Sequence, residues 1–117
     1  MNNFRELKVW EKAIGLVTQI YESTKSFPAE EQFGLTNQIR RSAVSIPSNI
    51  AEGAGRKSEK EFENFLYVAL GSCFEIETQL IISNKLKYVS DENFKILETD
   101  IIEIEKMIRG LQKSINH

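Results

Sequence analysis

The chain has 117 residues, with 15 Lys and Arg against 17 Asp and Glu, which gives a formal net charge of -2. This length suits one domain and excludes a second independent one. Cys73 is the only cysteine, so a disulfide framework is excluded and a reducing, intracellular compartment is indicated. No apolar run approaches the roughly 20 residues of a membrane span, and the first residues lack the apolar core of a signal peptide. We therefore expect one cytoplasmic domain, residues 1–117, without membrane contact.

Apolar residues recur at spacings of three and four along the chain, a pattern that stacks side chains on one face of a helix. It predicts four helices, at about residues 4–25, 35–54, 59–86 and 91–115. Asn3 and Ser58 are suited to cap the first and third helices, and each is followed three residues later by a glutamate, as in a capping box. Phe27-Pro28 separates the first helix from the second.

The second helix contains Pro47, which removes one backbone hydrogen bond and is expected to kink it. Gly53 and Gly55 supply its stop. Matched helices joined by short connections predict an all-α fold, an antiparallel up-down four-helix bundle. In the first helix we assign one of two apolar rows to the core: Leu7, Trp10, Ile14, Val17, Tyr21 and Thr24.

Two rows of residues remain outside this predicted core. Small side chains in them would let another helix approach closely, and a polar residue among them can set the register. A bundle of four helices has no fully surrounded helix, so we predict that these rows form an interface between subunits. The alternative is that the second helix is crowded inside a single bundle. The predicted interface residues are Val9, Ala13, Leu16, Ile20, Asn37, Val44, Ser48 and Ala51.

The residue types that metal binding and catalysis require are missing from this chain. Di-iron bundles need Glu-x-x-His pairs and zinc sites need Cys and His sets, whereas the one histidine is His117, the last residue. Cys73 lies on the core row of the third helix without a base to activate it, which predicts an inert thiol. We expect no catalytic residue, no metal and no cofactor.

One acidic residue falls on the apolar face of the third helix. Glu77 shares that face with Leu66, Leu70 and Cys73, so its carboxylate must find a cationic partner or lose its charge. Arg40 or the adjacent Arg41 is available for this role. We predict a buried, structural ion pair between Glu77 and Arg40.

The charges are unevenly distributed along the chain. Residues 1–60 hold nine Lys and Arg against seven Asp and Glu, whereas residues 61–117 hold six against ten. A basic cluster of this kind can contact phosphates. The alternative is a solvated loop whose positive charge suits the end of a helix. The candidate nucleic-acid-binding residues are Arg41, Arg56, Lys57 and Lys60.

Three stretches of the sequence carry a family resemblance. They are Phe4-Arg5-Glu6-Leu7-Lys8-Val9-Trp10 and Arg41-Ser42-Ala43-Val44-Ser45-Ile46-Pro47-Ser48-Asn49-Ile50-Ala51-Glu52-Gly53, and Glu75-Ile76-Glu77-Thr78-Gln79-Leu80 follows further on. This order resembles the bacterial four-helix bundle proteins known as 23S rRNA intervening-sequence proteins. It is similar also to the accessory variability determinants of diversity-generating retroelements.

The resemblance implies a ring-like homopentamer of four-helix bundles without catalytic activity. The retroelement relatives bind RNA and a reverse transcriptase through the basic surface of the ring. Two functions are therefore open for this chain. One is a homo-oligomeric RNA-binding module, and the alternative is a protein-interaction scaffold, such as a partner of a reverse transcriptase, that makes no direct contact with nucleic acid.

Overall fold

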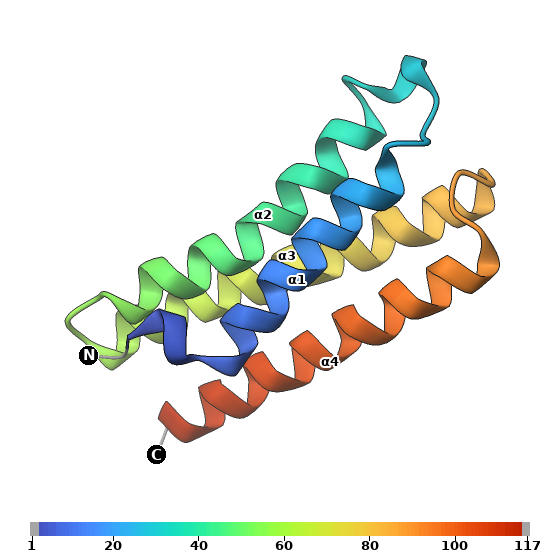
Figure 1. The fold of residues 1–117 in the computed structure, drawn as a ribbon. Coiled ribbons are helices and arrows are strands. Elements are labelled where there is room, and N and C mark those ends of the chain that lie inside the picture. The colour runs from blue at the N-terminus through green and yellow to red at the C-terminus, as the bar shows by residue number, and fades with distance from the viewer. Residues whose placement is uncertain (1–2, 116–117) are drawn as a thin grey trace.

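The computed structural model describes residues 3–115 and forms an elongated bundle of 44 × 24 × 20 Å. Its helices are α1 (Lys8–Thr24), α2 (Leu35–Ala54), α3 (Glu59–Lys85) and α4 (Asp91–Ile115), and single 3-10 turns precede α1 and α2. Successive helices run in opposite directions, and both chain ends lie at the end of the bundle that holds the α2–α3 turn (Figure 1). The predicted all-α four-helix fold is confirmed, and His117 lies outside the described residues.

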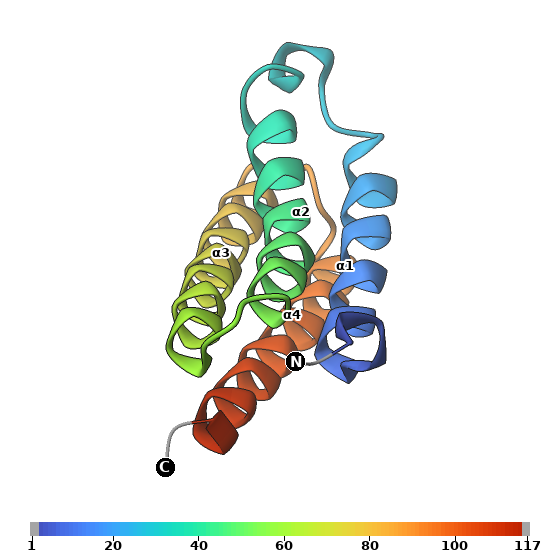
Figure 2. The ribbon, with the colours of Figure 1, turned by 90° about the vertical axis from the view of Figure 1, so that its left-hand side faces the viewer.

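The four helices form a closed square in cross-section. Each helix packs against the next in sequence, and α1 also packs against α4. Viewed from the side in Figure 2, α2 stands between α1 and α3. Side chains of α2 line two grooves, one together with residues of α1 and one together with residues of α3.

Side chains cap the two long helices as their sequences suggest. The Ser58 hydroxyl accepts a hydrogen bond from the backbone N–H of Glu61 (3.1 Å) at the start of α3. The Ser90 hydroxyl accepts one from the N–H of Asn93 (3.1 Å) at the start of α4. Each cap satisfies a backbone donor that the first turn of a helix leaves without a partner.

The predicted first helix, 4–25, is divided near its start. Asn3 caps the 3-10 turn Phe4–Glu6, Leu7 is extended (φ -78°, ψ 121°), and α1 begins only at Lys8. This break folds the Phe4 ring back against Trp10, with the ring centres 5.2 Å apart. The first residues thereby cover one end of α1 instead of lengthening it.

Gly53 lies within α2 and does not end it, contrary to the expectation from sequence. A Cβ atom at this position would stand 2.6 Å from the Cβ of Phe65 and 3.0 Å from Cδ1 of Phe62, both on α3. The missing side chain is therefore what lets α2 and α3 come together. Gly55 is the residue that caps the helix, which otherwise continues through the buried Pro47.

We predict that Gly53→Ala destabilises the fold by about 1–3 kcal/mol, because the added methyl group forces the backbones of α2 and α3 apart. Gly15→Ala is the matched control, since nothing lies within 4 Å of a Cβ in the middle of α1. That change should stabilise the protein by up to about 1 kcal/mol through helix propensity. Urea denaturation measures both, and equal effects of the two variants would contradict the steric account.

Candidate interaction surfaces

An apolar groove of about 310 Å³ runs along the outside of the bundle between α1 and α2. Exposed side chains of Ile14 and Val44 face it from opposite sides, each 39% accessible. The residues that line this α1/α2 groove are Phe4, Trp10, Ile14, Val17, Val44, Pro47, Ser48 and Ala51.

On the first helix the structure exchanges the two rows that the sequence assigned, except at Thr24, which is buried as expected. Val9, Ala13, Leu16 and Ile20 are between 0 and 4% exposed, so they belong to the core and cannot form an interface. The row of Trp10, Ile14 and Val17 lies outside instead, in the α1/α2 groove. The two rows are one residue apart, a rotation of about 100° about the helix axis. Apolar spacing alone does not say which row faces inward.

The predicted interface residues of the second helix do lie on its outer side. Asn37, Val44 and Ser48 are exposed, and Ala51 is half-buried. Val44, Ser48 and Ala51 line the α1/α2 groove, whereas Asn37 lines the polar groove between α2 and α3. Their role as contacts between subunits stays a prediction.

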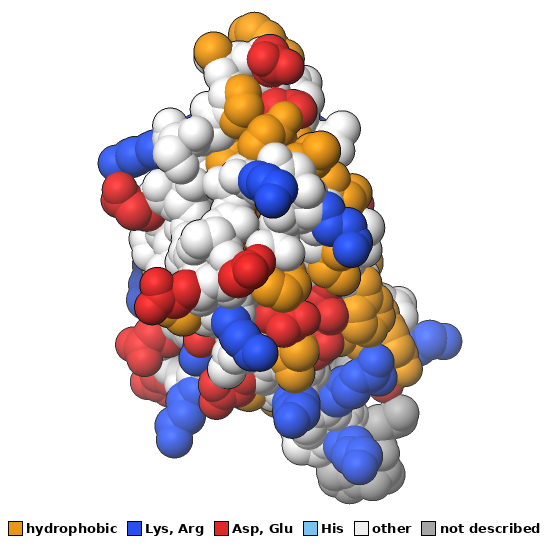
Figure 3. Space-filling view, turned by 90° about the vertical axis from the view of Figure 1, so that its right-hand side faces the viewer, with side chains coloured by type: hydrophobic (Ala, Val, Ile, Leu, Met, Phe, Trp, Pro, Cys, Tyr) orange, Lys and Arg blue, Asp and Glu red, His pale blue; other side chains and the backbone are white. Residues whose placement is uncertain are grey.

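A second apolar surface covers the outside of α3. Between residues 67 and 82 the exposed residues are two small ones, Gly71 and Thr78, one charged one, Glu75, and five large apolar ones. The apolar members are 41–57% accessible: Tyr67, Val68, Phe74, Ile81 and Ile82. Hydrophobic side chains gather along the right-hand edge of the face in Figure 3, whereas its left-hand edge is charged and polar. We call the eight exposed residues between residues 67 and 82 the α3 face.

By length and composition, α3 is apolar enough to cross a membrane, and 39% of the apolar window is buried within the bundle. A core helix of a globular bundle meets the same criterion. In α3 the criterion is met because apolar residues occupy both the side that faces the core and the α3 face.

The predicted ion pair between Glu77 and Arg40 is wrong. The Arg40 guanidinium donates from Nε to the Thr24 hydroxyl (2.8 Å) and from Nη2 to the Tyr21 carbonyl (3.3 Å), and it lies 4.6 Å from the centre of the Tyr21 ring. Arg40 therefore joins α2 to the end of α1, where a cation also suits the helix dipole. Glu77 lies on the side of α3 that faces α4, across the bundle.

The neighbour of Glu77 is another carboxyl group, that of Glu105 on α4. Burial, reinforced by the Glu77 carboxyl beside it, raises the pKa of Glu105 from 4.5 to about 8, and the charge of Arg109 opposes this rise. Oε2 of Glu105 is buried without a hydrogen-bond partner among the described residues. From its position on the apolar face of α3, Glu77 was expected either to pair with a cation or to lose its charge. In the structure it is the neighbouring carboxyl group, that of Glu105, whose charged form is disfavoured.

Cys73 lies close to these two carboxyl groups and is fully buried. Burial, followed by the charges of Glu105 and Glu77, raises the pKa of its thiol to about 12. A thiol that stays protonated is a poor nucleophile. Within residues 3–115 no group of three His, Cys, Asp or Glu side chains is placed to hold a metal ion.

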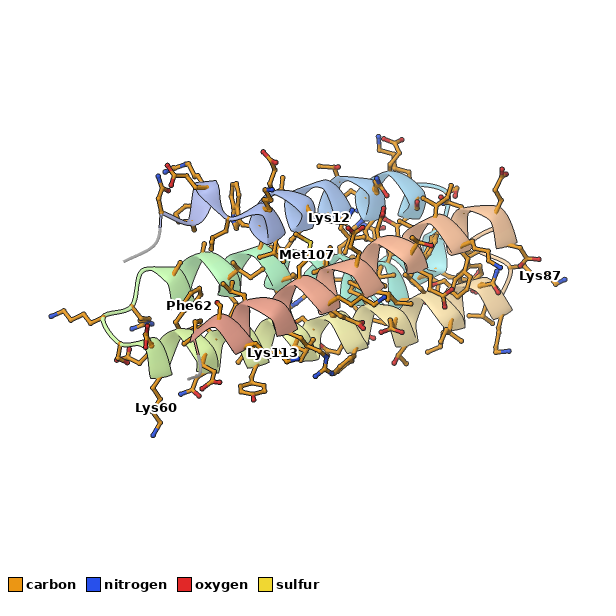
Figure 4. All side chains as sticks on the ribbon, turned by 90° about the horizontal axis from the view of Figure 1, so that it is seen from below. Lys12, Lys60, Phe62, Lys87, Met107 and Lys113 are labelled. Carbon is orange, nitrogen blue, oxygen red and sulfur yellow. The ribbon has the colours of Figure 1, made fainter. Side chains whose placement is uncertain are left out.

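The candidate nucleic-acid-binding residues are not gathered at one place. Arg41 lies in the first half of α2, about 20 Å along the axis from the last helical residue, Ala54, at 1.5 Å per residue, and Arg56 follows beyond that end. Arg56 is already engaged, since it pairs with Glu52 (2.8 Å) and lies 4.8 Å from the centre of the Phe65 ring. Lys57 and Lys60 are exposed at the α2–α3 turn, and Lys60 projects from that end of the bundle, opposite to Lys87 (Figure 4).

These features define an all-α up-down bundle with two exposed apolar surfaces and two exposed lysines near the α2–α3 turn. The chain belongs to the 23S rRNA-intervening sequence protein family, whose model matches residues 5–110. Among solved structures it is similar to a protein of unknown function from the S23 ribosomal protein family of Bacteroides thetaiotaomicron VPI-5482. The two are 29% identical over 90% of this chain and 95% of that chain, with a TM-score of 0.83. No curated protein matches the chain. Neither the family nor the structural neighbour carries the name of an enzyme activity.

We predict that the free energy of unfolding falls by about 1–2 kcal/mol from pH 5 to pH 8 because of Glu105. The effect is no larger because Glu105 is partly exposed to solvent. Between pH 4.5 and 8 the unfolded chain releases the Glu105 proton while the folded chain retains it, so raising the pH favours unfolding. Glu105→Gln should be more stable than the wild type at pH 8 and should lose most of this slope.

Glu103→Gln is the control for this comparison, because Glu103 is an exposed carboxylate of α4 that pairs with Lys12 at 3.3 Å. It should keep the wild-type slope. Denaturant titrations at four or five pH values measure all three proteins. A Glu105→Gln variant with an unchanged slope would show that Glu105 does not titrate in this range.

Proposed function

We propose that this protein is a non-enzymatic, self-associating four-helix bundle that binds structured RNA. The observation that carries the proposal is the uncovered α1/α2 groove, in which apolar side chains such as Ile14 and Val44 stand open to solvent. Contiguous exposed apolar surface of this kind marks sites of association in folded proteins. Self-association into a ring follows the resemblance noted in the sequence, which implies five copies.

The groove has the composition of an interface core. Its lining combines aromatic residues, Phe4 and Trp10, with aliphatic ones and small ones, and it holds no charged side chain. Interface cores are enriched in aromatic residues and depleted of charge. The small residues Ser48 and Ala51 on α2 would let a helix of another copy approach closely.

The RNA-binding part of the proposal is supported by two exposed lysines near the α2–α3 turn, Lys57 and Lys60. In a ring related by cyclic symmetry every subunit has the same orientation, so Lys57 and Lys60 of all copies would lie at one end of the assembly. One copy offers two exposed lysines there, beside the exposed Glu59 and Glu61, and several copies would repeat the lysines as contacts for the phosphates of one backbone. The family name refers to 23S rRNA, which favours RNA as the nucleic acid.

The oligomeric part is tested by placing a charge in the groove. The wild type should have a mass several times 13.4 kDa, and Val44→Glu should be monomeric, because a buried, unpaired carboxylate is costly at an interface. Ile96→Glu is the matched control, since Ile96 is 52% exposed on α4, outside both apolar surfaces. Light scattering measures the masses, and circular dichroism confirms that each variant is folded. A monomeric wild type would refute self-association.

The RNA-binding part is tested with structured RNA at several salt concentrations. The double variant Lys57→Glu, Lys60→Glu should bind at least about tenfold more weakly than the wild type and show a shallower salt dependence, because each lost phosphate contact lowers the slope. The variant Lys95→Glu, Lys106→Glu makes the same change in net charge on α4 and should bind normally. If the wild-type oligomer binds no RNA at low salt, the scaffold alternative replaces this proposal.

A further inference from the structure

We infer that the polar groove between α2 and α3 binds a guanine base, either that of a free nucleotide or an unpaired one in RNA. This α2/α3 groove has a volume of about 420 Å³; it begins at Phe33 in the α1–α2 turn and follows the first half of α2. The α2–α3 turn, which carries Lys57 and Lys60, is at the opposite end of the bundle (Figure 1). The site is therefore separate from the proposed lysine contacts, and it needs no second copy of the chain.

The two helices place opposite charges on the two sides of the α2/α3 groove. Ser45 of α2 and Ser72 of α3 are joined by a hydrogen bond of 2.9 Å between their hydroxyls. Because these helices run in opposite directions, one turn back along α2 is level with one turn forward along α3. Arg41 therefore lies across the groove from Glu75, and both residues line it.

The polar groups of this groove do not satisfy one another. Within residues 3–115 neither Arg41 nor Glu75 has an ion pair or a side-chain hydrogen bond. Ser42 lines the groove and is only 8% exposed, yet its hydroxyl has no hydrogen-bond partner among these residues. Oε1 of Gln79, on the α3 side, is buried and has none either. Buried polar groups in proteins are almost always hydrogen-bonded, so these atoms point to a polar ligand.

An exposed aromatic ring stands at the end of the groove nearest the α1–α2 turn. Phe33 lines the groove and is 88% exposed, so the chain itself leaves both faces of its ring open. Proteins that bind unpaired nucleotides stack the bases on aromatic side chains of this kind. A free amino acid could match the charges of Arg41 and Glu75, but it has no planar face to stack on Phe33. A planar, polar ring is therefore the better-matched ligand.

The donors and acceptors of the groove select guanine among the bases. O6 and N7 of guanine accept hydrogen bonds, and a guanidinium such as that of Arg41 can donate to both atoms at once. The N1–H and N2–H groups of guanine donate, which suits the carboxylate of Glu75 and the unpartnered Oε1 of Gln79. Adenine has an acceptor at N1 and a donor at N6, where guanine has a donor and an acceptor. Both sides of the groove would therefore be mismatched with adenine.

Isothermal titration calorimetry with GMP and AMP tests this assignment. The wild type should bind GMP at least about tenfold more tightly than AMP, because a good bidentate contact discriminates between bases by about this factor. Glu75→Gln should lose most of this preference. Glu92→Gln removes the same charge from an exposed position on α4 and should keep it. Phe33→Ala should weaken both nucleotides by a similar factor of about ten, because stacking does not distinguish the bases.

A second arm separates the two sources of the base. It uses RNA hairpins that differ only in one unpaired loop base, G or A, measured with the same four proteins. A preference for G that depends on Glu75 and is found with GMP assigns the free nucleotide. The same preference found only with the hairpins assigns an unpaired guanine in RNA. Circular dichroism confirms that each variant is folded.

The inference is overturned if neither arm shows a preference for G over A, or if Glu75→Gln keeps the wild-type preference. Binding of L-glutamine without binding of either nucleotide would also overturn it and would indicate an amino-acid site. RNA binding that depends on Lys57 and Lys60 but not on the loop base would leave the proposed function intact while removing the guanine site. Loss of RNA binding with retained GMP binding would do the reverse.

Discussion

Each helix of a four-helix bundle can bury one side against its neighbours, and in this chain α1, α2 and α3 carry apolar residues on a second side as well. The surplus is concentrated in the α1/α2 groove and on the α3 face, whereas the outer side of α4 is largely charged and polar. The hydrophobic effect scales with the apolar area removed from water, so this surplus is a driving force that the single chain leaves unused. The proposed assembly uses it.

Polar contacts at two points of α1 accompany the orientation in which Val9, Ala13, Leu16 and Ile20 face the core. Lys12 pairs with Asp100 and Glu103 on α4, at 3.6 and 3.3 Å, and Arg40 of α2 holds the end of α1 through Thr24. In this orientation Ala13 is buried and Ile14 is exposed in the α1/α2 groove. Gly53 sets the distance between α2 and α3, because a Cβ atom at this position would stand 2.6 Å from the Cβ of Phe65.

Much of the fold could be read from the sequence, because it depends on local patterns. Helix spacing, the Ser58 cap and the Phe27-Pro28 break identify four helices, and the order of the motifs identifies the family. The rotation of α1 could not be read, since two apolar rows one residue apart satisfy the same periodicity. The 3-10 turn at Phe4 was missed for a related reason: Asn3 and Glu6 fit the capping of a helix as well as that of a turn.

The candidate site was less predictable, because it depends on which surfaces meet. The outer residues of α2, such as Val44, were recognised from their small size and their position opposite the core row. The predicted pair of Glu77 and Arg40 was wrong, because the sequence shows on which face of its helix a residue lies. It does not show which residue of a neighbouring helix lies opposite. The α3 face carries a signal that could have been found: between Glu63 and Lys85 the helix has two acidic residues and no basic one, too few charges for a solvated side.

Trp10 allows the central claim to be tested most directly, because it is the only tryptophan of the chain and lines the α1/α2 groove. Its fluorescence and its quenching by acrylamide can be followed through a dilution series of the wild-type protein. If copies cover the groove, Trp10 is shielded at high concentration, and on dilution its emission shifts to the red and its quenching increases. Emission and quenching that are the same at every concentration, with the quenching of a half-exposed indole, would contradict the account.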